Sequence, residues 1–231
     1  MSDRVLGVVL AAGRASRMGH AKQLAELGGR PLLEHVLAAM SAAPLDDLVV
    51  ALGAYADEVL ARVDLHRARP LVVPDWERGM GRVLALALAS AAPDGATGAA
   101  NGGWGAVVVA LGDQPLVGAA VVGRLVDAWR RGAGPVVSAA YHGRTGHPKL
   151  FDRAVVGPLR GLAGDEGARG LLASHPEWVA AVEVGRLGSD LDVDDEAGLA
   201  RARDVLAARL GSHPVDETFD NPSDEPRDGR R

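Results

Sequence analysis

The sequence predicts an α/β fold, in which a doubly wound and mostly parallel sheet has helices on both faces. Short runs of valine and leucine alternate along the chain with segments of helical periodicity, a pattern typical of β-α-β units. The run Val107–Leu111 is apolar throughout, as expected of a strand covered on both faces. A length of 231 residues suits one such domain.

The elements are expected in a regular order. Val5–Leu10 is the first strand. Pro31 begins a helix through Met40, because proline suits the first helical turn and the apolar residues that follow share one face. The remaining elements are expected as strands at 48–52, 71–73, 107–111, 135–140 and about 179–184, and as helices at 56–63, 80–91, 121–131, about 167–174 and 195–210.

Two segments lie outside this pattern. Residues 93–105 read PDGATGAANGGWG, which predicts a flexible surface loop. Residues 211–231 are polar, contain proline and lack periodicity, so we expect a disordered tail. Residues 1–210 are therefore expected to form a single domain.

Composition excludes several classes of function. A net charge of −5 argues against general binding to nucleic acids or anionic membranes. The chain has no cysteine, which excludes disulfides and thiolate metal sites. No apolar stretch is long enough to span a membrane and no secretory hydrophobic region follows the N-terminus, so we expect a cytoplasmic protein.

The first strand opens into a loop of small and basic residues, which are Ala11, Ala12, Gly13, Arg14, Arg17, Gly19 and Lys22. The two glycines allow a ligand to approach the backbone closely, so that N–H groups face phosphate oxygens. Arg17 and Lys22 supply positive charge. The loop is neither a P-loop nor a G-x-G-x-x-G motif. The alternative is an ordinary basic turn, which requires neither two glycines nor three cations.

Lysine is rare in this chain, since Lys22 and Lys149 are the only lysines among 25 basic residues. A guanidinium does not replace a compact ammonium at a tight phosphate site, so we expect Lys22 to bind phosphate. For Lys149, retention by chance is the alternative.

A second motif, Gly-Asp-Gln-Pro at 112–115, follows the strand at 107–111. Asp113 and Gly13 both lie just past the carboxyl end of a strand, where sheets of this kind bind ligands. A carboxylate in the same cleft as a phosphate loop is a natural ligand for Mg²⁺, which would bridge nucleotide phosphates. The alternative role of Asp113 is in a turn or a helix cap.

The segment SDLDVDDE at 189–196 supplies further carboxylates. Asp194 and Asp195 suit a helix start, where aspartate caps free N–H groups. A helix start does not explain Asp190 and Asp192, which alternate on one face of an extended segment. Both are candidate metal ligands beside Asp113.

The N-terminal loop resembles the signature of the MobA-like nucleotidyltransferases, and within them of the molybdenum cofactor cytidylyltransferases. That signature is L-A-A-G-x-S-x-R-M-G followed by a lysine. The matching residues are Leu10, Ala11, Ala12, Gly13, Ser16, Arg17, Met18, Gly19 and Lys22. The resemblance extends from about residue 5 to about residue 200 and implies a Rossmann-like nucleotidyltransferase fold.

Weaker motifs extend the resemblance. The family's G-D-x-P holds magnesium, a role that falls to Asp113, and Asp190 and Asp192 match its D-I-D-T-P. Its G-H-P and G-D-x-G-A-R segments imply that His147 and Arg169 belong to the wall that receives a pterin. A structural role is the alternative for His147, and an ion pair with Asp165 is the alternative for Arg169.

A third stretch of the family lies near the base and ribose. Its pattern is matched here by Pro74, Asp75, Trp76, Gly79, Met80 and Leu84. Val73 replaces the usual asparagine, and Arg82 and Val83 replace the usual serines, which leaves the base and the substrate open. Trp76 is equally well explained as a core residue.

The resemblance implies transfer of CMP from CTP to the terminal phosphate of a molybdopterin-type cofactor, with Mg²⁺ as cofactor and pyrophosphate as product. Arg17 and Lys22 would be catalytic, by neutralising the triphosphate. The implied nucleotide-binding residues are Leu10, Ala11, Ala12, Gly13, Arg14, Lys22, Gly79 and Asp113. The Ala-Ala-Gly form of the loop, where guanylyl-transferring relatives carry Ala-Gly-Gly, implies cytosine.

The partners implied are CTP, the pterin substrate and, transiently, a molybdoenzyme or its maturation factor. Two alternatives remain open. One is nucleotidyl transfer from CTP or GTP to another phosphorylated acceptor. The other is a non-catalytic carrier of molybdenum cofactor.

Overall fold

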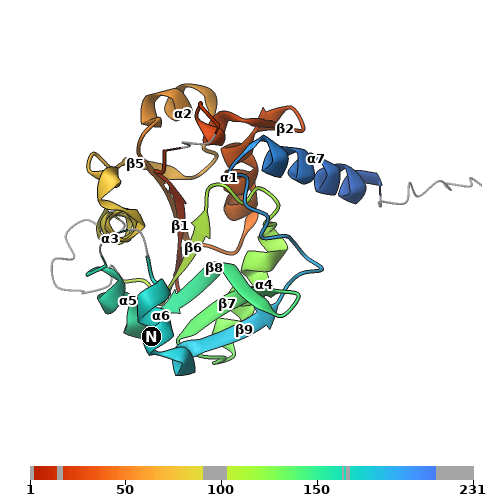
Figure 1. The fold of residues 1–231 in the computed structure, drawn as a ribbon. Coiled ribbons are helices and arrows are strands. Elements are labelled where there is room, and N and C mark those ends of the chain that lie inside the picture. The colour runs from red at the N-terminus through yellow and green to blue at the C-terminus, as the bar shows by residue number, and fades with distance from the viewer. Residues whose placement is uncertain (1–2, 15–17, 91–102, 163, 165–166, 212–231) are drawn as a thin grey trace, which may run out of the picture.

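The computed structural model describes residues 3–14, 18–90, 103–162, 164 and 167–211. They form a seven-stranded sheet in the order β5-β4-β1-β6-β8-β7-β9, with helices on both faces (Figure 1). The strands are β1 (Val5–Ala11), β4 (Asp47–Leu52), β5 (Arg69–Val72), β6 (Ala106–Leu111), β7 (Val136–Tyr141), β8 (Arg144–Asp152) and β9 (Val179–Glu183). All neighbours pair in parallel except β6 with β8 and β7 with β8. This architecture confirms the predicted fold class.

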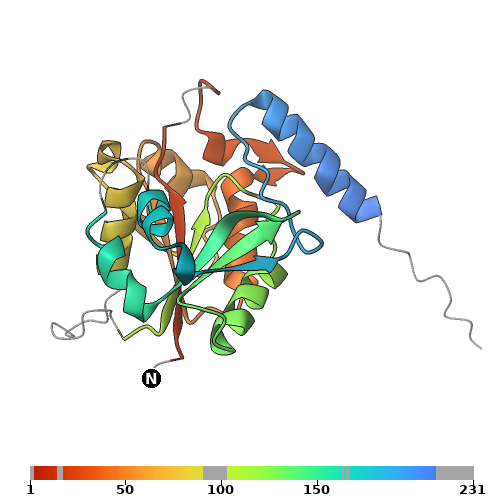
Figure 2. The same ribbon diagram turned by 60° about the horizontal axis from the view of Figure 1, so that its bottom comes forward.

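Two apolar layers sandwich the sheet (Figure 2). On one face lie α1 (Leu32–Ala42), α2 (Ala56–Arg62) and α4 (Ala119–Arg130). On the other face lie α3 (Met80–Ser90), α5 (Arg153–Leu159) and α6 (Arg169–Ser174). The valine-rich strands β1 and β6 are buried between these layers, so they form the rigid centre from which the loops at their carboxyl ends project.

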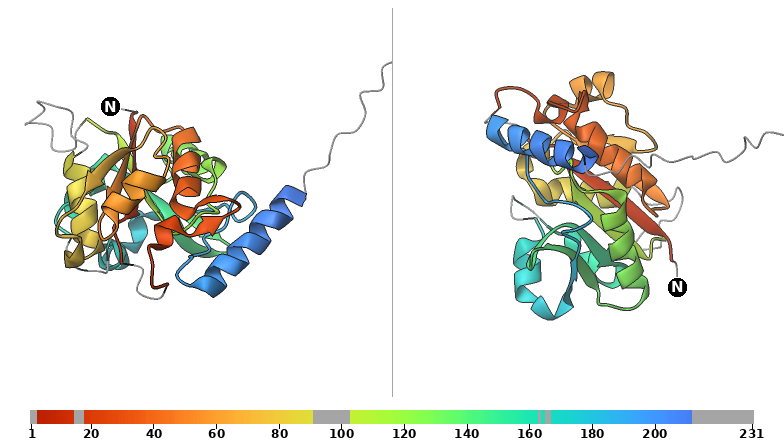
Figure 3. Two further views of the ribbon diagram at one scale, coloured as in Figure 1. Left: turned by 90° about the horizontal axis from the view of Figure 1, so that it is seen from above. Right: turned by 90° about the vertical axis from the view of Figure 1, so that its right-hand side faces the viewer.

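A third apolar cluster lies at one end of the molecule. The last helix, α7 (Glu196–Gly211), packs against a hairpin of β2 (Glu26–Leu27) and β3 (Arg30–Pro31), as Figure 3 shows. Leu27, Leu199 and Ala202 are buried in this contact. Arg203 Nη2 of the helix donates to the Glu26 carbonyl at 3.0 Å. The contact therefore holds the last helix against the N-terminal part of the chain.

The sequence analysis missed β8 and α5, together with the short strands β2 and β3 and the 3-10 helices. The tight turn at His142 and Gly143, both with positive φ, joins β7 to β8 as a hairpin. Ser138 pairs with Lys149 and Ala140 pairs with Thr145, so residues 146–148 bulge opposite Ala139. Helix α5 begins at a cap that the Asp152 side chain supplies to Ala154 N, 2.8 Å away.

Most of the expected loop at 93–105 and nearly all of the expected tail at 211–231 lie outside the described residues. Within the part that is described, no helix combines the length and the apolar character needed to cross a bilayer.

Candidate nucleotide-binding site

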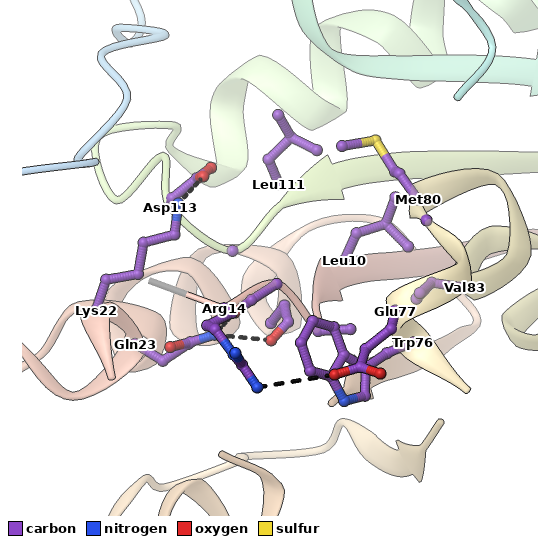
Figure 4. Close-up of a pocket in the computed structure, with 15 residues that line it drawn as sticks. Leu10, Arg14, Lys22, Gln23, Trp76, Glu77, Met80, Val83, Leu111 and Asp113 are labelled. Atoms are coloured by element: carbon purple, nitrogen blue, oxygen red, sulfur yellow. Dashed lines mark hydrogen bonds and ion pairs between the residues drawn. The ribbon is translucent and has the colours of Figure 1, made fainter. Parts of the chain in front are cut away.

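A cleft of about 610 Å³ opens where β1 and β6 end (Figure 4). The loop after β1 forms its floor, the turn after β6 forms one side, and residues before and within α3 form the other. Its lining includes every nucleotide-binding residue expected from the sequence, namely Leu10, Ala11, Ala12, Gly13, Arg14, Lys22, Gly79 and Asp113. Arg17, the other expected catalytic residue, lies outside the described residues.

Gln23 holds the floor of the cleft in place. Its side chain is buried, and Nε2 donates to the carbonyls of Ala11 at 2.9 Å and Gly13 at 3.2 Å. Apart from its two chain neighbours, no described residue has a heavy atom within 4 Å of the position that a Cβ on Gly13 would take, so these residues leave space against the loop backbone. The sequence analysis missed Gln23, whose signal was its place directly after Lys22 in the 3-10 helix Lys22–Leu24.

Lys22 bridges two carboxylates from distant parts of the chain. Its Nζ lies 2.6 Å from Asp113 Oδ2 and 2.8 Å from Asp194 Oδ1. The Lys22 side chain is only 17% exposed, and burial alone would lower its pKa. The charges and hydrogen bonds of Asp113 and Asp194 outweigh burial and raise the pKa of Lys22 above its usual value. The ammonium is therefore charged at neutral pH.

The acidic segment runs beside the turn after β6. Val193 N donates to the Asp113 carbonyl at 3.0 Å, and Gln114 Nε2 donates to Asp192 Oδ1 at 2.9 Å. Partial burial and the negative charges of Asp113 and Asp194 raise the pKa of Asp192, although the Gln114 hydrogen bond opposes that shift. Three carboxylates, those of Asp113, Asp192 and Asp194, thus influence one another at this side of the cleft.

The aspartates of this segment have different surroundings. Asp195 caps α7 as predicted, since its Oδ1 accepts from Gly198 N at 2.7 Å. Asp194 was assigned to the same helix start, but it pairs with Lys22 instead. Asp190 turns toward the β8 bulge, where its Oδ2 lies 2.9 Å from the position of a Cβ on Gly146.

The donor set suits a hard divalent cation. Asp113 Oδ1 is buried without a hydrogen-bond partner among the described residues, so it can accept a ligand that the protein does not supply. Among those residues, no three acidic or histidine side chains form a metal cage of their own. Mg²⁺ typically binds one or two carboxylates and takes its other ligands from water and phosphate. The carboxylates present fit that mode of binding.

The opposite side of the cleft is built around Trp76. A Cβ on Gly53 would lie 2.7 Å from Trp76 Cγ and 2.4 Å from the Ala12 carbonyl, so the absence of a side chain at Gly53 lets the indole approach the loop. The Arg14 guanidinium lies 5.7 Å from the Trp76 ring centroid and 3.7 Å from Glu77 Oε1 (Figure 4). Trp76 both packs on the core and lines the cleft, so the two roles considered for it are compatible.

Arg82 and Val83, which stand where the family has serines, have distinct roles. Arg82 Nε lies 2.8 Å from Asp75 Oδ2, and this hydrogen bond lowers the pKa of Asp75 below its usual value. Val83 is buried and lines the cleft. Gly79, with a φ of +99°, ends the 3-10 helix Trp76–Arg78 directly before α3.

A second cavity of about 790 Å³ adjoins the cleft, because Met80 and Leu111 line both. It contains the expected substrate residues His147 and Arg169, together with Asp190 and Asp192. Burial, reinforced by the charges of Lys149 and Arg169, lowers the pKa of His147 to about 4, so its imidazole is neutral at pH 7. Asp165, the alternative partner of Arg169, lies outside the described residues.

Comparisons with known proteins agree with this geometry. The model of the MobA-like NTP transferase domain matches residues 7–179. A nicotine blue oxidoreductase of Paenarthrobacter nicotinovorans is 34% identical over 82% of this chain and 92% of its own.

Two solved structures are also similar. A homologue of the Mycobacterium tuberculosis protein Rv0371c from Mycobacterium sp. strain JC1 is 35% identical over 91% of this chain and 100% of its own, with a TM-score of 0.76. Rv0371c itself, from Mycobacterium tuberculosis H37Rv and in complex with manganese, is 32% identical over 87% of this chain and 98% of its own, with a TM-score of 0.71.

Proposed function

Because this chain belongs to the MobA-like NTP transferase family, we propose that it transfers CMP from CTP to the terminal phosphate of a molybdopterin-type cofactor. The observation that carries the proposal is the meeting of Lys22 with Asp113, 2.6 Å apart, in a cleft whose floor is the loop Ala11–Arg14. A fixed cation, an available carboxylate oxygen and exposed loop backbone are the parts that a triphosphate and its metal require.

In the proposed reaction, an oxygen of the acceptor phosphate attacks the α-phosphorus of CTP. The bond from that phosphorus to the bridging oxygen of the β-phosphate breaks, and pyrophosphate leaves. The substrate brings its own nucleophile, so the protein supplies alignment and charge compensation. Backbone N–H groups of the loop would hold the phosphates, while Arg14, Arg17 and Lys22 would balance their charge.

Mg²⁺, when bound, would neutralise charge on the triphosphate. We propose Asp113 and Asp192 as its ligands, with Asp190 as a further candidate. The manganese complex of Rv0371c supports the use of a divalent cation by a relative. The preference for CTP is proposed from the Ala-Ala-Gly form of the loop, and release of the product to a molybdoenzyme or its maturation factor is part of the same proposal.

The test is magnesium-dependent release of pyrophosphate from CTP in the presence of molybdenum cofactor, with GTP, ATP and UTP as competing donors. We expect Asp113→Asn to lower the rate at least about 100-fold, because a carboxylate ligand contributes several kcal/mol to binding and orienting the metal and phosphates. Equal rates for the two proteins would remove Asp113 from the reaction. A wild-type rate confined to GTP, or to another phosphorylated acceptor, would keep the reaction class and change its substrates.

The nicotine blue oxidoreductase favours a second candidate function, an oxidoreductase reaction on nicotine blue or a similar compound at the same cleft. The discriminating assay follows oxidation of a reduced nicotinamide dinucleotide with nicotine blue as the acceptor. An oxidoreductase would turn over in this assay and release no pyrophosphate from any nucleoside triphosphate. A protein that binds molybdenum cofactor but is inactive in both assays would be a carrier.

A further inference from the structure

Lys149, the second of the two lysines, faces the cavity beside the nucleotide cleft. It follows the β8 bulge, and its Nζ donates to the Gly146 carbonyl at 2.6 Å and to Ser138 Oγ at 3.0 Å. Ser138 is fully buried, so the ammonium is held by a fixed part of the sheet. An ammonium has three N–H donors, which leaves one of them for a ligand.

A second cation shares this cavity with Lys149. Arg169, the first residue of α6, also lines it, and its charge together with burial lowers the pKa of Lys149 to about 8. Within the described ranges, neither Lys149 nor Arg169 forms an ion pair with an acidic side chain. Lys149 is half-buried and Arg169 is exposed, and two like charges that share a cavity repel each other unless an anion joins them, which is the arrangement of a binding site rather than of a structural contact.

The carboxylates in the cavity do not fill that role. Asp192 accepts a hydrogen bond from Gln114, the residue after Asp113. Asp190 lies beside Gly146, and its charge helps to raise the pKa of Tyr141. Neither aspartate forms an ion pair with Lys149 or Arg169 in the part of the chain that the structure describes.

We propose that Lys149 and Arg169 form a subsite for an oxyanion, a phosphate or carboxylate group, carried by the acceptor substrate. This inference rests on the proposed function, because it takes the second cavity as the place of the acceptor. Met80 and Leu111 line both cavities, so a ligand in one would lie close to a ligand in the other. A guanidinium can bind such a group through two parallel hydrogen bonds while the ammonium adds a point charge.

The rarity of lysine gives a direct test. Protein grown with lysine ¹³C-labelled at Cε has two lysine side-chain signals, and Lys149→Arg identifies which belongs to Lys149. Inorganic phosphate is titrated in one arm and acetate in the other, at constant ionic strength, to separate the two oxyanions. We expect one of them to shift the Lys149 signal saturably.

Arg169→Gln is the informative variant, since Arg169 is exposed and its loss removes no contact within the described residues that the fold requires. We expect it to weaken the anion's effect on the Lys149 signal about 10-fold, the value of one charge-assisted hydrogen bond pair. Arg124→Gln, an exposed arginine of α4 on the opposite face of the sheet, is the matched control and should leave that effect unchanged.

A Lys149 signal that neither anion moves would overturn the subsite, as would an equal response in wild type and Arg169→Gln. A shift confined to the Lys22 signal would do the same, since it reports binding in the nucleotide cleft. The titration requires no turnover, so the subsite can be established even if nucleotidyl transfer fails. Where transfer occurs, Arg169→Gln should raise the KM for the acceptor about 10-fold and leave the KM for CTP unchanged.

Discussion

At the scale of single residues, Lys22 determines the electrostatics of the cleft. Its ammonium lies between Asp113 and Asp194, where a polyanionic substrate would otherwise meet two uncompensated negative charges. Burial strengthens such interactions because water screens them less. A change of partner for Lys22, from these carboxylates to a bound triphosphate, would accompany entry of a divalent cation.

Asp190 and Asp194 are expected to differ in their effect on metal use. Asp194 shares the Lys22 ammonium with Asp113, so its loss would leave that ammonium to Asp113 alone, in competition with a metal, whereas Asp190 lies beside Gly146. We expect Asp194→Asn to raise the Mg²⁺ concentration for half-maximal activity about 10-fold, and Asp190→Asn to change it less than about two-fold, an outcome that would leave the metal to Asp113 and Asp192. A larger effect for Asp190→Asn, measured in the same pyrophosphate assay, would reverse this ranking.

His147 is expected to make stability depend on pH. Its pKa is lowered to about 4 in the folded protein, against about 6.5 in an unfolded chain. As the pH falls from about 6.5 toward 4, the unfolded chain takes up the proton first, so the free energy of unfolding decreases.

Between about pH 7 and about pH 5, the free energy of unfolding should fall by about 1–2 kcal/mol less in His147→Gln than in the wild-type protein. Urea unfolding of both proteins at the two pH values measures the difference. Parallel pH profiles would show that His147 is already accessible to protons in the native state.

At the scale of secondary structure, the sequence analysis succeeded where strands are continuous and apolar. The valine runs of β1 and β6 were located to within a residue, and with them the two loops that face the cleft. It failed for β8, because Gly146 and Pro148 interrupt that strand's pattern where residues 146–148 bulge. Lys149 could not be assigned for the same reason, since its neighbours Ser138 and Arg169 come from elements that only the tertiary fold brings together.

The acidic segment shows a second limit of pattern reading. Asp190, Asp192 and Asp194 share one alternation, which could have grouped all three. The cap at the start of α7 competes for the same residues, and only Asp195 takes it. The local preference of aspartate for a helix start predicted a capping role for Asp194. The long-range ion pair with Lys22 takes that side chain instead.

The close approach of Trp76 to the loop after β1 is expected to require Gly53. In Gly53→Ala the added methyl group would lie 2.4 Å from the Ala12 carbonyl, which is backbone and cannot turn aside. We expect a loss of about 1–3 kcal/mol in stability and weaker binding of CTP. Gly157→Ala in α5 is the control, because open space surrounds that position, and it should stabilise the protein by roughly 0.5–1 kcal/mol. Thermal unfolding and CTP titration distinguish the two, and a tolerated Gly53→Ala would contradict the packing argument.

At the scale of the whole molecule, α7 secures the acidic segment against the N-terminal hairpin. Leu199 is 3% exposed in this contact. Leu199→Ala should cost about 2–4 kcal/mol and speed amide hydrogen exchange across residues 189–195. Leu187→Ala, at a leucine 43% exposed, is the matched control and should change stability by less than about 0.5 kcal/mol. Unchanged exchange in Leu199→Ala would mean that the acidic segment is held independently of the helix.

The placement of the two lysines has a practical consequence for handling the protein. The side-chain amine of Lys22 lines the nucleotide cleft, and that of Lys149 lines the cavity beside it. Acylating dyes, amine-coupled sensor surfaces and lysine-directed crosslinkers would therefore attach either at the chain's α-amino group or inside the pockets under study. Lys149, with a pKa of about 8, titrates in the same range as an α-amino group, so a lower pH does not direct coupling away from the second cavity, and attachment chemistry that spares amines is preferable.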